Sequence, residues 1–355
     1  MTDVLDTSAE SIARAAECLR RGGLVAFPTE TVYGLGAHAL DADAVRRLFA
    51  AKARPATDPL IVHVSAWEDV EELVGEELLT GPYSRARRLA ACFWPGPLTL
   101  VLPRGVRIPR EVTAGLDTAG VRIPAHPVAR ALLVAARIPI AAPSANLFSR
   151  PSPTLAAHVL QDLDGRIDMV IDGGATNVGV ESTVLDLTAD VPTILRPGAV
   201  TREMLEQYLP TVAVGGDLKA APYHPYHSEG TATPSPGMLA KHYSPRAPLT
   251  LYEGPHALER MVGVVSGSAE RGQLVGVLVP REHAARFEDL PVRVEDLGPA
   301  DDLQTMATRL YAALRELDAS GVDAIFALGI DATEGLGTAL RDRLRRAAAG
   351  RIIST

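Results

Sequence analysis

The stretch Leu24-Val25-Ala26-Phe27-Pro28-Thr29-Glu30-Thr31 (residues 24–31) indicates the fold class. Its four leading apolar residues predict a buried strand, and a polar turn follows directly. Upstream, residues 7–10 read as a helix capping box and Gly22-Gly23 as the left-handed end of that helix. Open α/β sheets place ligand contacts just past the ends of buried strands, so the turn at 28–31 is a candidate site.

The same alternation of helix and strand predicts three parts in the chain. Residues 1–210 are expected to form a twisted mixed sheet with flanking helices, with strands near 60–64, 98–102, 138–142, 169–171 and 183–185 and helices near 43–51, 83–93 and from Pro127. Residues 211–248 are rich in Pro, Gly and His and too long for an ordinary connection, so we expect a lid over a pocket. Residues 249–355 predict a smaller doubly wound α/β domain, with strands at 274–279 and 324–328 and helices at 303–317 and 338–349.

Charge and cysteine content narrow the class of protein. The 355 residues carry 43 acidic and 35 basic side chains, a net charge of -8. The excess of acidic residues is spread over residues 1–210 and 211–355 alike. A dedicated nucleic-acid binder is normally basic in at least one domain. Cys18 and Cys92 provide neither a disulfide framework nor a cysteine zinc site. With no apolar signal segment or membrane-length apolar run, the sequence predicts a cytoplasmic protein without a membrane partner.

Two short strings supply groups that hold phosphate. Lys52-Ala53-Arg54-Pro55 offers a mobile ammonium and a planar guanidinium where a helical pattern gives way to a strand. Ser144-Ala145-Asn146 offers a hydroxyl and a carboxamide on a turn after an apolar run. Each string alone is as typical of a solvated surface. Together they predict a polyphosphate site.

Further polar residues stand at predicted strand ends, and none is an obvious nucleophile. Arg122 lies between Val121 and Ile123 in a strand pattern, and Arg196 precedes a Pro-Gly turn. The nine histidines show no order that predicts a Ser-His-Asp triad. Several cations and hydroxyls without a nucleophile suit transfer to or from a phosphate, because that chemistry depends on positioning and charge neutralisation. From the residues alone the reaction stays open.

The motifs, taken in order, resemble the YrdC-type domain over about residues 8–210. They are residues 28–35, 52–55, Trp94-Pro95-Gly96-Pro97-Leu98-Thr99, 121–124, 142–146, and Ser182-Thr183 with 195–198. Pro236-Gly237, His242-Tyr243-Ser244-Pro245 and the closing 335–348 extend the likeness to the long, two-domain threonylcarbamoyl-AMP synthases.

The resemblance implies a nucleotidyltransferase that condenses L-threonine, bicarbonate or carbon dioxide, and ATP into threonylcarbamoyl-AMP and pyrophosphate, for the threonylcarbamoyladenosine modification of tRNA. It implies Mg²⁺ as a cofactor accompanying ATP and downstream tRNA threonylcarbamoyl transfer enzymes as partners. Direct tRNA binding is not expected. No covalent enzyme intermediate is needed, which agrees with the missing nucleophile.

The resemblance also implies a role for each candidate residue. The catalytic signature is Lys52, Arg54, Ser144 and Asn146. ATP is expected to contact Lys52, Arg54, Asp58, Thr118, Ser144, Ser152 and Arg196, and threonine is expected to contact Thr31, His63, Arg122, the backbone of Ala142, and Ser182. Asp58 would repel phosphate unless a magnesium ion intervened. No set of side chains predicts a metal site of the protein's own.

The chain departs from the family's sequence pattern at two places, and two alternative functions remain to be weighed. Family members commonly carry glycine where this chain has Ser149, so a positive φ there would strain the serine. Leu239-Ala240 replaces a basic and an aromatic residue in the predicted lid. A double-stranded RNA-binding module is disfavoured by charges of -5 over residues 1–210 and -3 over 211–355. A carbamoyltransferase acting through carbamoyl-AMP would bring cysteine zinc fingers that two cysteines cannot supply.

Overall fold

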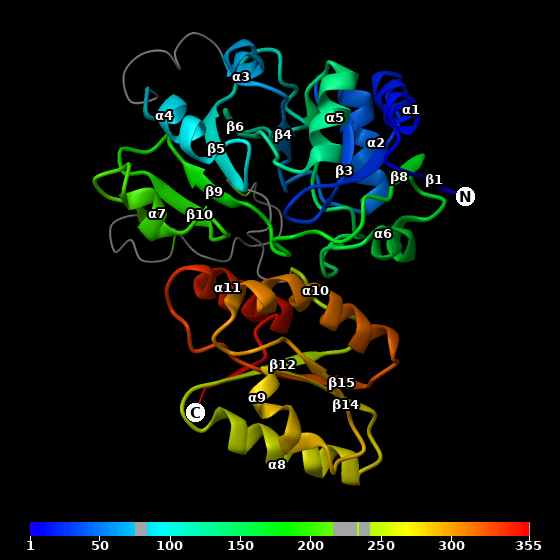
Figure 1. Ribbon diagram of the computed structural model, residues 1–355, viewed down its shortest axis with the longest axis vertical. Helices are drawn as coiled ribbons and strands as arrows, with labels where there is room; N and C mark the ends of the chain where they lie inside the picture. The colour runs from blue at the N-terminus through cyan, green and yellow to red at the C-terminus, as the bar shows by residue number, and fades with distance from the viewer. Residues whose placement is uncertain (75–83, 216–232, 234–241, 355) are drawn as a thin grey trace. The chain divides into compact units, whose positions relative to one another are not determined.

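The computed structural model describes residues 1–74, 84–215, 233 and 242–354. The chain divides into two compact units (Figure 1). The first comprises residues 1–148, 153–177 and 181–239, and the second comprises 149–152, 178–180 and 240–355.

The first unit is built on a mixed sheet with the strand order β1-β8-β2-β3-β7-β4-β6-β5-β9-β10-β11. The strands are β1 (Asp3–Leu5), β2 (Val25–Pro28), β3 (Tyr33–His38), β4 (Ile61–His63), β5 (Leu98–Pro103), β6 (Thr118–Arg122), β7 (Ile140–Ala141), β8 (Met169–Ile171), β9 (Thr183–Asp186), β10 (Thr193–Arg196) and β11 (Ala213–Val214). Both parallel pairs, such as β4 with β6, and antiparallel pairs, such as β2 with β3, occur. This confirms the predicted mixed sheet.

Alternation along β2 divides the core of this unit between the two faces of the sheet. Val25 and Phe27 pack with the apolar stripes of α1 and α5, whereas Ala26 joins the larger cluster that includes α2 and α6. The helices are α1 (Ala9–Arg20), α2 (Ala42–Lys52), α3 (Trp67–Val74), α4 (Ser84–Phe93), α5 (Pro127–Ala136), α6 (Ala156–Leu163) and α7 (Arg202–Glu206). In Figure 1, α1 and α5 lie side by side.

The elements predicted for the first unit occur in the structure, but the prediction missed the short β1, β11, α3 and α7, and it missed β3. Strand β3 was not predicted, because Gly34 and Gly36 interrupt its apolar pattern. The structure explains Gly36, because a Cβ there would lie 2.8 Å from the Ile140 side chain and 2.9 Å from the Phe27 ring, whereas a Cβ on Gly34 would make only ordinary van der Waals contacts, at 3.4 Å or more. The ring of Phe27 therefore packs against β3 at Gly36, where there is no room for a side chain. The predicted cap of the first helix is also corrected, since Ser8 rather than Thr7 caps α1.

The second unit is a five-stranded parallel sheet with the order β14-β13-β15-β12-β16. Its elements are β12 (Leu249–Glu253), α8 (Ala257–Glu270), β13 (Val275–Val279), α9 (Arg281–Ala284), η3 (Ala285–Phe287), β14 (Arg293–Asp296), α10 (Leu303–Ala319), β15 (Ala324–Leu328), α11 (Leu336–Ala348) and β16 (Ile352–Ser354). Helices α8 and α9 cover one face and α10 and α11 cover the other (Figure 1). Right-handed crossovers require this division, because the chain moves outward in opposite directions across the sheet. The predicted doubly wound domain is confirmed.

The predicted lid at 211–248 falls mostly outside the described residues. Within it the structure describes 211–215, which include β11, then Thr233, and 242–248. Thr233 belongs to the first unit, and its backbone N–H donates to the carbonyl of Thr57 over 3.1 Å. In the described part of the chain, no helix combines the length and apolarity needed to cross a bilayer.

Candidate active site

Lys52 brings the two phosphate-binding strings together. It is the last residue of α2, it is 1% exposed, and its ammonium donates to the carbonyl oxygens of Ser144 and Asn146. The backbone N–H of Phe148 returns a bond of 2.9 Å to the carbonyl of Lys52. A buried ammonium requires such partners. The structure therefore places Lys52, Ser144 and Asn146 in one cluster, as predicted.

Arg54 faces a different partner because α2 ends with a left-handed residue. Ala53 ends α2 in the left-handed conformation, with φ 51°, so that the chain turns there and the side chains of Lys52 and Arg54 point in different directions. The Arg54 guanidinium lies 2.9 Å from the Asp58 carboxylate and donates to the carbonyls of Asp58 and Pro59. Both side chains are buried, and Thr233 Oγ1 lies 3.4 Å from the other Asp58 oxygen. Asp58 thus balances the charge of Arg54.

Arg122 is held by an acid that the sequence prediction missed. From the end of β6, its Nη2 donates to Glu30 Oε1 over 2.6 Å, its Nη1 to Thr31 Oγ1 over 3.1 Å, and its Nε to the carbonyl of Gly96 over 3.1 Å. The second Glu30 oxygen accepts from the backbone of Ala125 over 3.0 Å. The only signal for Glu30 in the sequence was its place in the polar turn at residues 28–31, after the predicted strand.

Burial and hydrogen bonding act in opposite directions on the Glu30 carboxyl. Burial by itself raises its pKa, but the Arg122 charge and the bonds from Arg122 and Ala125 outweigh burial, so that the pKa of Glu30 is lowered. Glu30 is therefore ionised at neutral pH. The Arg122 side chain is likewise buried, at 3% exposure.

His63 lies beside Arg122, on the neighbouring strand of the sheet. The two residues are partners in the parallel register of β4 and β6. Complete burial, followed by the nearby Arg122 charge, lowers the pKa of His63 to about 3, so the imidazole is neutral. Its ring meets the Phe27 ring edge to face at 6.4 Å. Among the described residues, none bonds the buried Nδ1.

Ser182 and Arg196 were predicted to contact different ligands, and the structure places them in contact. Arg196 Nη2 donates to Ser182 Oγ and Nε to the Ser182 carbonyl, each over 3.2 Å. Ser182 Oγ also lies 2.8 Å from Thr99 Oγ1. The antiparallel pairing of β9 with β10 brings Arg196 to this serine, and the turn after β10 packs so closely that a Cβ at Gly198 would stand 2.4 Å from the backbone N of Thr183.

The remaining candidates are more scattered. Ala142 follows β7, and its backbone N–H donates to the carbonyl of Ile61 over 2.9 Å, so it lies beside β4 but has no free N–H to offer. Thr118 begins β6, about 13 Å along the strand from Arg122. Ser152 is fully buried and clusters with the second unit.

The charged candidates of the first unit form a cationic set. Four buried cations, Lys52, Arg54, Arg122 and Arg196, accompany three buried carboxylates, those of Glu30, Asp58 and Glu181, the last directly before Ser182 in the chain. Across the described ranges no three His, Cys, Asp or Glu side chains gather as metal ligands do. Asp58, the acid expected to face a magnesium ion, is engaged by Arg54, so these residues do not fit a resident magnesium site. The set favours anionic ligands.

Comparisons with known proteins identify the family. A family model described as "Telomere recombination" matches residues 17–198, and one described as "Threonylcarbamoyl-AMP synthase, C-terminal domain" matches residues 200–349. The threonylcarbamoyl-AMP synthase of Bacillus subtilis (strain 168) is 45% identical and covers 99% of this chain and 97% of its own. The chain belongs to the threonylcarbamoyl-AMP synthase family.

Other members of the threonylcarbamoyl-AMP synthase family match over nearly the whole chain as well. The enzyme of Pyrococcus abyssi (strain GE5 / Orsay) is 45% identical over 96% of this chain and 94% of its own. A crystal structure of P. abyssi Sua5 complexed with L-threonine has a TM-score of 0.89 and 42% identity, covering 100% of this chain and 99% of the other. The family therefore accounts for both units.

Proposed function

We propose that the chain is an L-threonylcarbamoyladenylate synthase, which condenses L-threonine, bicarbonate or carbon dioxide, and ATP into threonylcarbamoyl-AMP with release of pyrophosphate. Full-length similarity to proteins of that name supports the activity. The observation in this chain that supports the proposal most is the buried contact of Lys52 with the turn at residues 144–146, because it brings a cation to a hydroxyl and a carboxamide from a distant segment, and these groups suit a phosphate. Neither the RNA-binding nor the carbamoyltransferase alternative has comparable support.

Arg122 is the proposed partner of the threonine carboxylate. A guanidinium has five N–H groups, and Glu30, Thr31 and Gly96 take three of them. One N–H on each terminal nitrogen remains, which is the fork that binds a carboxylate with two parallel bonds. The neutral His63, opposite Arg122, offers its buried Nδ1 to the amino or hydroxyl group of the same ligand.

The proposed reaction needs positioning rather than a covalent intermediate. The threonine amine, once deprotonated, captures carbon dioxide as a carbamate. A carbamate oxygen then forms a bond to the α-phosphorus of ATP, and the bond from that phosphorus to the bridging oxygen breaks, releasing pyrophosphate. Lys52, Arg54 and Arg196 would offset the repulsion between the two anions. Magnesium would enter bound to ATP, as part of the substrate.

The wider setting is proposed on the same basis. The product would pass to enzymes that transfer threonylcarbamoyl to tRNA, and the chain would act in the cytoplasm without contacting tRNA itself. The net charge of -8 supports the last point.

Pyrophosphate release by the purified protein tests the proposal. With ATP and Mg²⁺ present, threonine and bicarbonate are omitted in turn, and release is expected only when both are supplied. Carbamoyl phosphate in place of threonine is the control for the carbamoyltransferase alternative. Release that needs neither threonine nor bicarbonate would contradict the synthase.

A further inference from the structure

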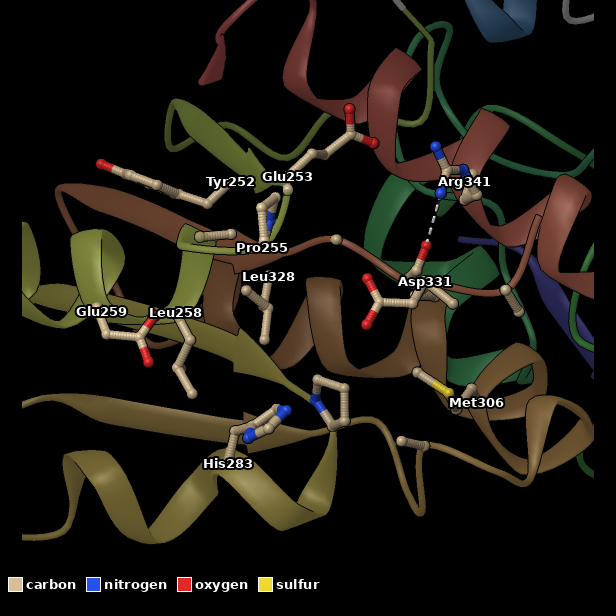
Figure 2. Close-up of a pocket in the computed structure, with 17 residues that line it drawn as sticks. Tyr252, Glu253, Pro255, Leu258, Glu259, His283, Met306, Leu328, Asp331 and Arg341 are labelled. Atoms are coloured by element: carbon tan, nitrogen blue, oxygen red, sulfur yellow. Dashed lines mark hydrogen bonds between the residues drawn. The ribbon is translucent and has the colours of Figure 1, made fainter. Parts of the chain in front are cut away.

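The second unit contains a pocket of about 680 Å³ that the proposed reaction does not use (Figure 2). It opens at the carboxyl ends of three neighbouring strands, β12, β13 and β15, and the residues just past each strand line it. This volume lies within the ~300–1,000 Å³ that small-molecule sites occupy. All of the lining residues belong to the second unit.

The strand connections explain why a pocket forms at this place. The chain leaves β12 for α8 on one face of the sheet, and it leaves the adjacent β15 for α11 on the opposite face. The two exits diverge and open a crevice between them. Such a reversal is where doubly wound α/β sheets bind small ligands, nucleotides in particular.

The wall of the crevice is held by contacts made next to it. The Gly329 N–H donates to the Tyr252 carbonyl over 2.7 Å, and a Cβ on Gly329 would lie only 2.9 Å from the Glu253 side chain. Arg341 donates to the carbonyl of Ile330 over 3.0 Å (Figure 2). Glu253 is paired with Arg345 at 2.9 Å. Glu253 and Arg341 are therefore already engaged by protein groups beside the crevice.

Two other carboxylates remain available to a ligand. Asp331 and Glu259 stand on opposite sides of Leu328 in Figure 2, and among the described residues neither carboxylate has a hydrogen-bond or ion-pair partner. Leu258 and Leu328 supply apolar lining, and His283 lies below them in the view of Figure 2. Carboxylates accept hydrogen bonds from hydroxyl groups, and an apolar wall accommodates a flat ring.

The charge of the lining argues against a phosphorylated ligand. The lining has one guanidinium, that of Arg341, which already donates to the wall, and one imidazole, that of His283, whereas the carboxylates of Asp331 and Glu259 are both without a partner among the described residues. A phosphate group would meet repulsion from both. We propose that this pocket binds a nucleoside without phosphate groups, with its base against Leu258 and Leu328 and its ribose hydroxyl groups donating to Asp331. This proposal does not depend on the proposed function.

Methyl NMR of the full chain, titrated with adenosine, tests the proposal. The signals of Leu258, Leu328, Ile330 and Met306 report on this pocket alone, so that adenosine bound in the first unit is not mistaken for it. We expect saturable shifts of these signals, a dissociation constant about tenfold higher in Asp331→Asn, and weaker binding of ATP than of adenosine at the same signals. Glu334→Gln is the matched control, because it removes an exposed carboxylate from the same loop outside the pocket, and it should bind like the parent.

Three results would overturn the proposal. The first is unmoved pocket signals at 10 mM adenosine, a concentration chosen to be about tenfold above a millimolar dissociation constant. The second is unchanged affinity in Asp331→Asn, with Glu259→Gln as the second variant if Asp331→Asn alters the spectrum of the free protein. The third is ATP binding at least as tight as that of adenosine, which would mean that the lining attracts phosphate.

Discussion

At the scale of single residues, buried pairing decides what a substitution does. Arg54 and Asp58 are both buried and 2.9 Å apart, so removing one partner leaves an uncompensated charge. We expect Arg54→Ala to abolish turnover and also to lower the free energy of unfolding by about 3 kcal/mol. The Arg54→Ala/Asp58→Ala double variant should regain part of that stability while staying inactive. Urea denaturation of the two single variants and the double variant measures the coupling; additive losses would mean that the pair contributes nothing.

Glu30 holds the Arg122 guanidinium in place, and the Glu30→Gln variant tests this positioning role. The amide can still accept from Arg122, but its NH₂ group then faces the N–H of Ala125, donor against donor. We expect the KM for threonine to rise about tenfold, with a smaller change in kcat and an unchanged KM for ATP. Glu72→Gln removes an acid from an exposed ion pair with Arg107 and is the control. Equal changes in the KM of both substrates would argue for a merely structural role.

The same carboxylate makes stability depend on pH. The pKa of Glu30 in the folded protein is lowered from its ordinary value of 4.5. Its contribution is therefore fully present above that value and is lost as the pH falls through the folded-state pKa. The stability gap between the parent and Glu30→Gln should be widest at neutral pH and narrow below pH 4.5. Thermal unfolding from pH 7 to about pH 3 measures it, and a gap that widens in acid would contradict the assignment.

At the scale of elements, the loop after the 144–146 turn carries backbone strain. Ser149 has φ 68°, the left-handed conformation that the glycine of related sequences would adopt freely. We expect Ser149→Gly to raise the free energy of unfolding by about 1 kcal/mol. Ser320→Gly, at φ -72°, is the control and should lower it. A loss of stability in Ser149→Gly would show that the serine side chain matters more than its backbone.

At the scale of the whole molecule, the second unit includes two short segments from the first two hundred residues of the chain. Residues 149–152 and 178–180 cluster with it, and Arg315 of α10 donates to the Pro151 carbonyl over 2.6 Å. Deleting 211–355 removes the packing partners of both segments together with the predicted lid. We expect the truncated chain to accumulate no threonylcarbamoyl-AMP, measured by chromatography of the product, with circular dichroism as the folding control. A folded truncation with parental activity would reduce residues 211–355 to an accessory.

The sequence by itself determined the fold class, most of the helices and strands, and the family, because these depend on local periodicity and on short motifs. It determined which cations and hydroxyls to consider, since their chemistry is intrinsic to the residue type. Only the tertiary structure decided their partners: Glu30 for Arg122, Asp58 for Arg54 and Ser182 for Arg196. The same holds for the pocket between β12 and β15. Pairing across many residues depends on how a sheet orders its strands, and that order is set by the packing of the whole unit rather than by any local pattern.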